Sequence, residues 1–196
     1  MRIFITGGSG FIGGALLESL VNSKNYISTI SRFDYESLNS LDLVVKGDIE
    51  QLNKNNKLSV VVEGVLENTD VVIHLAGRAH IVADNSTNPL NEYRKINRDA
   101  TLTLARIAAK SGVKRFVFLS SIGVNGNQNT KPFLESDTPN PQEPYAISKY
   151  EAEQGLFKLA KETNMEVVII RPPLVYGANA PGNFGRLINW ASKKHP

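Results

Sequence analysis

A tyrosine and a lysine stand four residues apart in this chain, at Tyr145 and Lys149. The periodicity after Pro144 predicts a helix over Tyr145–Thr163, so both side chains share one helix face, with Cβ atoms about 5–6 Å apart. Two unit charges about 4 Å apart interact by roughly 1–4 kcal/mol, so the ammonium is expected to bring the tyrosine pKa from about 10 toward 7. A tyrosine with that pKa suits general acid–base chemistry.

A second feature with chemical meaning is a run of glycines after the first apolar segment. Residues 3–13 read Ile-Phe-Ile-Thr-Gly-Gly-Ser-Gly-Phe-Ile-Gly. Gly7 permits a sharp turn, Gly10 permits close approach of a pyrophosphate, and Gly13 permits close packing of the next helix, whose N-terminus attracts phosphates. The pattern predicts a dinucleotide site; the alternative is a glycine-rich turn without a ligand.

Neither feature is decisive by itself. Tyr-x-x-x-Lys is an ordinary helix pair in many unrelated proteins, and short glycine patterns occur in ordinary turns. Their significance lies in their combination with Ser120 and Ser121, two hydroxyls at the end of an expected strand.

The order of apolar and amphipathic stretches indicates how these residues are positioned. Helices are expected over Gly10–Ser23, Asn91–Ser111 and Tyr145–Thr163. Several of the strands between them are apolar almost throughout, as in a parallel sheet covered on both faces. We predict an α/β fold, a doubly wound parallel sheet of the Rossmann type with helices on both faces, and a long ligand-side loop over Gly123–Pro144. Strands are expected at Arg2–Thr6, Tyr26–Ser31, Leu43–Lys46, Asp70–Leu75, Arg115–Ser120 and Glu166–Ile170.

The composition excludes several classes of protein. The 196 residues, 41% of them hydrophobic, suit one globular domain, and the apolar runs are far shorter than the roughly 20 residues of a membrane-spanning helix. The net charge of +3 is scattered, which predicts no nucleic-acid partner. No cysteine and no signal peptide are evident, so a cytoplasmic location is expected. His74, His80 and His195 lack metal-ligand spacing, so we expect no metal and place them in solvent or at a cofactor rim.

Seven motifs in order give the chain a resemblance to a known family. The chain resembles the extended short-chain dehydrogenase/reductases, in the NAD-dependent epimerase/dehydratase family that acts on nucleotide sugars. Within that family, Gly77–His80 and Arg171–Gly177 are similar to bacterial UDP-N-acetylhexosamine 4-epimerases and 4-keto reductases. The motifs are Thr6–Gly13, Gly47–Asp48, His74–Gly77, Asn97, Ser120–Ser121, Tyr145–Lys149 and Arg171–Gly177.

The resemblance implies a role for each matching residue. Tyr145 would exchange a proton with a sugar hydroxyl, Lys149 would hold the nicotinamide ribose, and Ser121, with Ser120 as the alternative, would hydrogen-bond the reacting oxygen. The residues implied to bind the substrate are Ser121 at the reacting oxygen, and Asn183 and Phe184 at the nucleoside diphosphate. The residues implied to bind the cofactor are Gly7, Gly10, Phe11, Ile12, Gly13, Ser31, Arg32, Asp48, Ile49, Leu75, Ala76, Gly77, Arg78, Asn97, Tyr145, Lys149 and Pro172.

The chain departs from the family pattern at the end of the second expected strand. That position usually carries an acid that binds the adenine ribose of NAD, whereas residues 30–33 here read Ile-Ser-Arg-Phe and the first carboxylate is Asp34. Ser31 and Arg32 suit a 2′-phosphate, so the prediction favours NADP over NAD. The alternative is that Arg32 lies in a surface loop and stacks on adenine.

The chain is also shorter than the family pattern. We expect residues 1–177 to form the NAD(P)-binding domain with the catalytic residues, and residues 178–196 to begin a substrate-binding region that is largely missing. Little or no activity is therefore expected from these residues alone, with an exposed apolar strip at Phe184, Leu187 and Ile188. The helix Asn91–Ser111 is first a core helix, and the resemblance implies that it also contributes to a homodimer.

The function that these observations favour is a UDP-hexose or UDP-N-acetylhexosamine 4-epimerase with a nucleotide-sugar substrate. A 4-keto sugar-nucleotide reductase would use the same residues and stays open. A non-catalytic, NADP-binding regulatory protein on the same fold is a further alternative, although such a protein has no need of Ser121, Tyr145 and Lys149 together.

Overall fold

The fold is known from a computed structural model, which describes residues 1–35, 38–79, 86–177, 180, 185 and 190–192. The predicted substrate residues Asn183 and Phe184, the strip residues Leu187 and Ile188, and two of the three histidines, at positions 80 and 195, lie outside these described residues.

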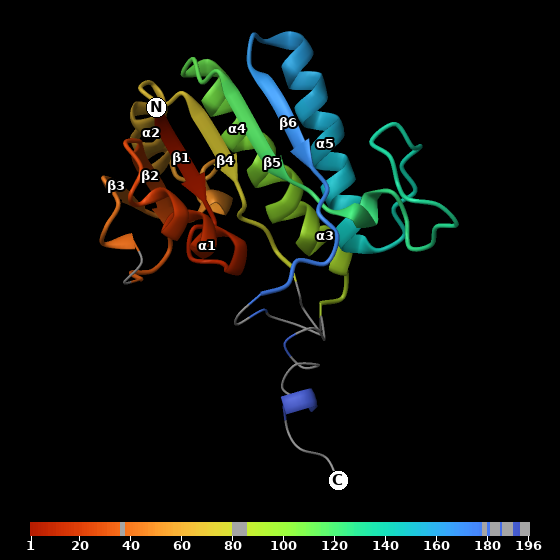
Figure 1. The fold of residues 1–196 in the computed structure, drawn as a ribbon. Helices are drawn as coiled ribbons and strands as arrows, with labels where there is room; N and C mark the ends of the chain where they lie inside the picture. Colours follow the sequence, from red (N-terminus) through yellow and green to blue (C-terminus); the bar gives the residue numbers. More distant parts are fainter. Residues whose placement is uncertain (36–37, 80–85, 178–179, 181–184, 186–189, 193–196) are drawn as a thin grey trace.

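Six parallel strands form one sheet in the order β3-β2-β1-β4-β5-β6 (Figure 1). In the centre, Ile5 pairs with Thr29 on one side and with Ile73 on the other. The strand order reverses between β1 and β4, and in such sheets the crevice beyond the carboxyl ends at that point binds ligands. The strands are β1 (Arg2–Thr6), β2 (Tyr26–Ser31), β3 (Leu43–Lys46), β4 (Val71–His74), β5 (Arg115–Leu119) and β6 (Glu166–Ile170), which confirms the expected strands to within a residue at each end.

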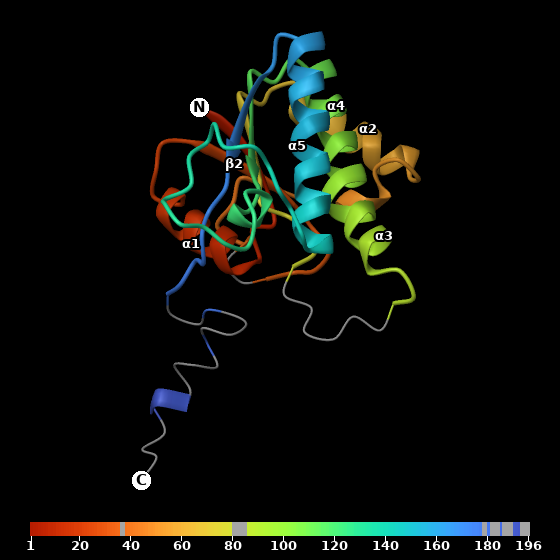
Figure 2. The ribbon, with the colours of Figure 1, turned by 90° about the vertical axis from the view of Figure 1, so that its right-hand side faces the viewer.

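Helices lie on both faces of the sheet, as predicted (Figure 2). One face carries α1 (Phe11–Leu20), and the opposite face carries α2 (Asn56–Leu66), α4 (Thr101–Lys110) and α5 (Pro144–Glu162). The sequence analysis did not identify α2. Its signals are a cap, in which the Asn55 side chain accepts a hydrogen bond from the N–H of Leu58, and buried apolar residues four apart at Leu58, Val62 and Leu66.

The predicted helix Asn91–Ser111 is a continuous run of three segments. It comprises α3 (Pro89–Tyr93), the π-helical segment η3 (Arg94–Ala100) and α4. Asn88 caps its start by accepting from the N–H of Asn91. Two short 3-10 segments, η2 (Ile49–Gln51) and η4 (Ile122–Val124), follow β3 and β5, and the predicted loop runs from η4 to α5.

The two sides of the sheet differ in how they are covered. β1 and β2 are buried almost throughout, as expected for strands between two helical layers. β5 and β6 instead alternate: Phe116 and Phe118 are buried toward α4 and α5, whereas Val168 and Ile170 are 39% and 45% exposed. Among the described residues, the core cluster around α1 includes residues of β1 to β4 but none of β5 or β6.

Within the described part of the chain, no helix is long and apolar enough to cross a membrane.

Candidate active site

The glycine turn has the close contacts that its sequence predicts. Gly7 has a φ of +75°, and a Cβ there would lie 2.6 Å from the backbone nitrogen of Ala76. A Cβ on Gly13 would lie 2.0 Å from the carbonyl oxygen of Gly7, so helix α1 packs against the turn only with glycine there. Gly10 is different, because its Cβ would meet only the Gly7 oxygen, at 3.2 Å. The protein leaves space above Gly10, which suits a ligand at the N-terminus of α1.

Two adjoining cavities at the carboxyl ends of the strands form one cleft around this turn. One, of about 380 Å³, reaches the end of β2, and the other, of about 450 Å³, reaches α5. Gly7, Gly10, Leu75 and Gly77 line both. An extended ligand lying across the turn would therefore contact β2 at one end and α5 at the other. The described residues fit a dinucleotide, since the turn offers close backbone approach in the middle and polar side chains at both ends.

The structure brings nearly all the predicted cofactor residues to this cleft. The β2 end of the cleft is lined by Gly7, Gly10, Ser31, Arg32, Asp48, Ile49, Leu75, Ala76, Gly77 and Arg78. The α5 end is lined by Gly7, Gly10, Phe11, Ile12, Gly13, Leu75, Gly77, Tyr145, Lys149 and Pro172. Sequence reasoning missed several residues of the lining, among them Ser9 within the glycine turn and Pro173, Leu174 and Val175 beyond β6.

Asn97 is the predicted cofactor residue that does not line the cleft. Its side chain is buried; Oδ1 accepts from the N–H of Arg78 at 2.8 Å, and Nδ2 donates to the carbonyl of Arg78 at 3.1 Å and to Ser148 Oγ at 3.0 Å. These bonds join the segment after β4 to η3 and α5. In this structure Asn97 holds the wall of the cleft in place.

Tyr145 and Lys149 lie on one face of α5, at its N-terminal end beside the cleft. Lys149 Nζ donates to the carbonyl oxygen of Leu119 at 2.9 Å. The same atom lies 4.5 Å from the centroid of the Phe118 ring and 5.9 Å from that of the Tyr145 ring. The Tyr145 ring also has an edge contact with Tyr93, at 5.9 Å between centroids.

The charge states of this pair differ from the expectation. Burial lowers the pKa of Lys149 from 10.5 to about 7, although the Glu153 carboxylate opposes the change. Burial raises the pKa of the Tyr145 phenol, and the nearby Tyr93 adds to the effect. The predicted lowering of the tyrosine pKa toward 7 is therefore wrong for this structure. The ammonium is itself penalised by burial, and it hydrogen-bonds the Leu119 carbonyl.

The two serines after β5 have different surroundings. Ser121 lines the cleft, and its Oγ accepts from the N–H of Gly123 at 3.2 Å, which leaves its own proton available to a ligand. Ser120 Oγ instead donates to Glu153 Oε1 at 2.5 Å in a buried site. This difference favours Ser121 over Ser120 as the hydroxyl that contacts a ligand.

Arg32 defines the β2 end of the cleft. Its guanidinium lies 3.8 Å from Asp48 Oδ2 and 5.6 Å from the centroid of the Phe33 ring, and its side chain is 65% exposed. Ser31 Oγ donates to the carbonyl of Phe33 at 2.7 Å. The guanidinium is thus at the cleft edge, with one loosely held carboxylate partner.

His74 does not occupy the expected position in solvent or at the cofactor rim. It is fully buried, with Nδ1 2.6 Å from Thr6 Oγ1 and Nε2 2.8 Å from Thr101 Oγ1. Burial, helped by the positive charge of Lys149, lowers its pKa to about 3. The expectation fails because the alternation of β4 directs residue 74 toward α4. The described residues contain no cluster of three or more potential metal-ligating side chains.

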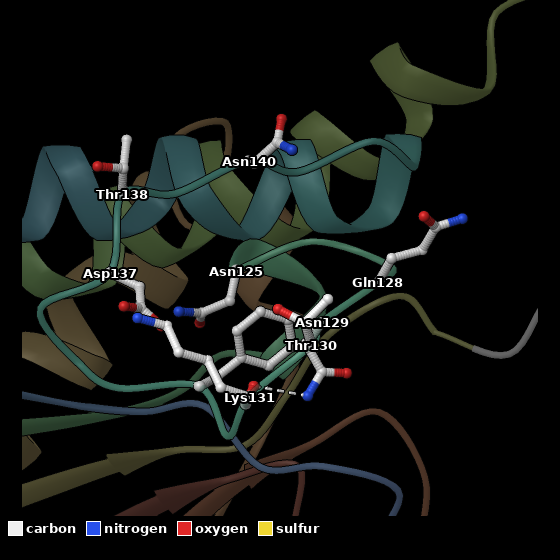
Figure 3. A pocket seen from close by; sticks show the side chains of 9 residues that line it. Asn125, Gln128, Asn129, Thr130, Lys131, Asp137, Thr138 and Asn140 are labelled. Carbon is white, nitrogen blue, oxygen red and sulfur yellow. Dashed lines mark hydrogen bonds between the residues drawn. The ribbon is translucent and has the colours of Figure 1, made fainter.

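The loop between η4 and α5 has a separate hollow of about 460 Å³, lined mainly by amide, hydroxyl and charged side chains (Figure 3). Asn125 lies at its inner side; Nδ2 donates to the carbonyl of Leu134, and Oδ1 accepts from Arg171 Nη1 at 3.1 Å.

Comparison with known proteins gives consistent matches. The model of the NAD dependent epimerase/dehydratase family matches residues 3–194. A UDP-glucose 4-epimerase of Vibrio cholerae is 42% identical over 198 residues, covering 99% of this chain and 58% of the relative. A human dTDP-D-glucose 4,6-dehydratase is 32% identical, covering 90% of this chain and 51% of the relative. The chain thus spans little more than half the length of these relatives.

Two of the solved structures with a similar fold contain UDP-glucose. MoeE5 in complex with UDP-glucose and NAD matches with a TM-score of 0.80 and 29% identity, covering 96% of this chain and 60% of that one. The UDP-glucose 4-epimerase of Thermotoga maritima with UDP-glucose matches with a TM-score of 0.77 and 30% identity, covering 90% of this chain and 57% of that one.

Proposed function

This chain belongs to the NAD dependent epimerase/dehydratase family, and from that premise we propose that the protein is a UDP-sugar 4-epimerase acting on a UDP-hexose or UDP-N-acetylhexosamine. The observation that carries the proposal is that Ser121, Tyr145 and Lys149 line the same cavity as the glycine turn. The relative from Vibrio cholerae and the UDP-glucose-bound structure from Thermotoga maritima support this substrate class. Because the named relatives are enzymes, a non-catalytic NADP-binding role is not favoured.

The chemistry divides between the cofactor and this chain. When bound, the nicotinamide supplies reversible hydride transfer at the sugar carbon. In the oxidation step Tyr145 would act as the phenolate and take the proton of the sugar hydroxyl, and in the return step the phenol would give that proton to the keto oxygen. Its raised pKa favours the phenol form. Lys149 in its charged form stabilises the phenolate and holds a ribose hydroxyl, and Ser121 donates to the reacting oxygen.

For the cofactor, family membership and the NAD-containing structure of MoeE5 indicate a nicotinamide dinucleotide. We propose that NADP is preferred over NAD. The support is that the exposed guanidinium of Arg32 and the side chain of Ser31 line the β2 end of the cleft, and a cation there would suit a 2′-phosphate. Asp48 is the competing influence, since it already attracts Arg32 and could itself accept a hydrogen bond from the adenosine.

The remaining assignments extend the same proposal. Residues 1–177 would form the dinucleotide-binding domain, and residues 178–196 would begin the substrate-binding region, with Asn183 and Phe184 contacting the UDP moiety. The helix run that includes α4 would contribute to a homodimer.

Two measurements test the proposal. Calorimetry with NAD and NADP should show that this chain binds a dinucleotide, more tightly with the 2′-phosphate. Incubating the protein from the complete gene with UDP-glucose or UDP-galactose should give interconversion without net cofactor oxidation, which Tyr145→Phe abolishes as the matched control. Net consumption of NADPH would identify a 4-keto reductase, and a failure to bind either dinucleotide would overturn the proposal.

A further inference from the structure

A buried carboxylate lies one helical turn beyond Lys149. Glu153 is 1% exposed, and its Oε1 accepts from Ser120 Oγ at 2.5 Å and from Arg171 Nε at 3.0 Å. Its Oε2 accepts from Arg171 Nη2 at 2.5 Å. A buried carboxylate is costly unless it is fully paired, so this set of bonds fixes the positions of all three side chains.

The partners of Glu153 belong to the ends of two strands. Ser120 follows β5 and Arg171 follows β6, and the backbones there are also joined: the N–H of Ser120 donates to the carbonyl of Ile170 at 2.7 Å, and that of Ile122 donates to Pro172 at 3.0 Å. Ser121 lies between the two joined residues. The position of its hydroxyl therefore depends on the position of these strand ends relative to α5.

Tyr145, Lys149 and Glu153 are spaced by four residues along α5 and so lie along one side of the helix. Tyr145 and Lys149 line the cleft, and Glu153 bonds to the strand ends that form its floor. The bonding continues outward, because Arg171 also donates to Asn125, which lies at the hollow of the loop (Figure 3).

We infer that Glu153 is a positioning residue of the proposed active site: its carboxylate fastens the ends of β5 and β6 to α5, sets the position of Ser121 relative to Tyr145, and places a negative charge next to the Lys149 ammonium. This inference rests on the proposed function, since these three groups need a common geometry only if they act on one substrate.

The charges around Lys149 are consistent with this role. Burial alone would lower the lysine pKa further, and Glu153 opposes that effect. Two other ionisable groups lie near Lys149: Tyr145 on the same helix, and His74 on β4, which burial keeps neutral. Directly after β6, Arg171 faces Glu153 and is paired with it. Glu153 thus favours the charged form of Lys149.

The test measures Lys149 directly. The Cε and Nζ chemical shifts of Lys149, assigned with Lys149→Arg, are followed from pH 5 to 10 in the wild type and in Glu153→Gln. We expect Glu153→Gln to lower the lysine pKa by about one unit, because an opposite charge nearby shifts a pKa by roughly 1–3 units. Glu151→Gln is the matched control, since Glu151 is on the same helix but pairs with Arg94 and Arg98. An unchanged titration in Glu153→Gln, or an equal shift in Glu151→Gln, overturns the inference.

A second variant keeps the inference testable if Glu153→Gln does not fold. Ser120→Ala removes only one partner of the carboxylate, and it should speed amide hydrogen exchange at Ile122 by about fivefold, the equivalent of one ordinary hydrogen bond. Thr163→Ala, which loses a bond to Leu159 at the far end of α5, should leave Ile122 unchanged. Unaltered exchange in Ser120→Ala would show that Glu153 does not fasten this strand end. Neither measurement needs substrate or turnover, so both stay informative if the protein proves not to be an epimerase.

Discussion

The glycine turn in the middle of the cleft and the α5 end of the cleft differ in whether backbone or side-chain atoms shape them. At the glycine turn the fit depends on the backbone, because a side chain on Gly7 or Gly13 would overlap main-chain atoms. Around Tyr145 and Lys149 the geometry depends on side chains that bond across elements, such as Lys149 to the carbonyl of Leu119. The glycines of the turn are neighbours in the sequence, although Gly7 also meets the backbone of Ala76. The α5 end instead depends on a side chain that reaches across thirty residues, from Lys149 to Leu119.

This difference shows which part of the cleft determines the position of a ligand and which part determines the charge states of the side chains. The backbone of the glycine turn determines where a ligand lies, but it does not alter the charge state of any side chain. A side-chain cluster also determines charge states, as burial does when it lowers the pKa of Lys149 to about 7 and raises that of Tyr145. Substitutions at the glycine turn should therefore alter cofactor binding, whereas substitutions at the α5 end should alter proton transfer.

The largest expected effect is at the turn. Gly10→Val fills the space that the protein leaves open above Gly10, so the branched side chain would occupy the place of the pyrophosphate. We expect dinucleotide binding to fall below detection in calorimetry while the fold is retained, as judged by circular dichroism. Wild-type dinucleotide affinity in this variant would show that the turn has only a structural role. It would also contradict the assignment of ligand binding to the glycine turn.

At the α5 end of the cleft, Tyr145→Phe removes the phenol hydroxyl and leaves the ring in contact with Tyr93. We expect turnover of the UDP-sugar by the protein from the complete gene to fall by about a hundredfold or more, the usual scale for lost acid–base catalysis. Cofactor affinity should stay near normal. The opposite pattern, normal turnover with weakened cofactor binding, would place Tyr145 in the binding half of the cleft.

A third prediction concerns His74, which links β4 to the turn through Thr6 and to α4 through Thr101. Its pKa of about 3 lies below the ordinary 6.5, so the unfolded chain takes up the proton first as the pH falls. This contribution to stability is complete above pH 6.5 and is lost as the pH falls toward 3. Between pH 7 and 5 we expect a loss of about 2 kcal/mol in the free energy of unfolding.

Urea titrations at several pH values measure this effect. His74→Gln should be less stable than the wild type at pH 7, yet it should lose little further stability between pH 7 and 5. If both proteins had the same pH slope, the buried histidine would not be its source.

The smallest expected effect is at Arg32, where solvent screens the charge. Arg32→Asp removes a cation from the predicted 2′-phosphate site and adds a carboxylate suited to a ribose. We expect the ratio of NADP to NAD affinity to fall by about tenfold, equivalent to about 1.4 kcal/mol. Lys54→Asp, a similar charge change at an exposed residue outside the cleft lining, is the control. An unchanged ratio in Arg32→Asp would mean that the cofactor preference does not depend on this residue.

Patterns within short stretches made most of the fold predictable. Apolar runs located all six strands, and the glycine spacing located the turn. Helix α2 escaped notice, although the Asn55 cap and the apolar residues four apart at Leu58 and Val62 are local signals. The cleft lining followed from motifs, but the roles of Asn97 and Glu153 did not, since Arg78 and Arg171 meet them only after folding. The Tyr145 pKa was mispredicted for the same reason: helix spacing gives neighbours but not the depth of burial.

The position of β1 in the sheet has a consequence for how the chain folds. Of the six strands of the sheet, β1 comes first along the chain, yet its partner β4 begins at Val71, and Arg2 N–H bonds to Asp70. The sheet must therefore close a loop of about 68 residues before its central pair exists, and β5 and β6 lie beyond β4 in the finished sheet. Each closure costs chain entropy before any contact compensates for it, which slows folding. The cleft, formed by strand ends from both sides of β1, is complete only when the last of these strands has docked.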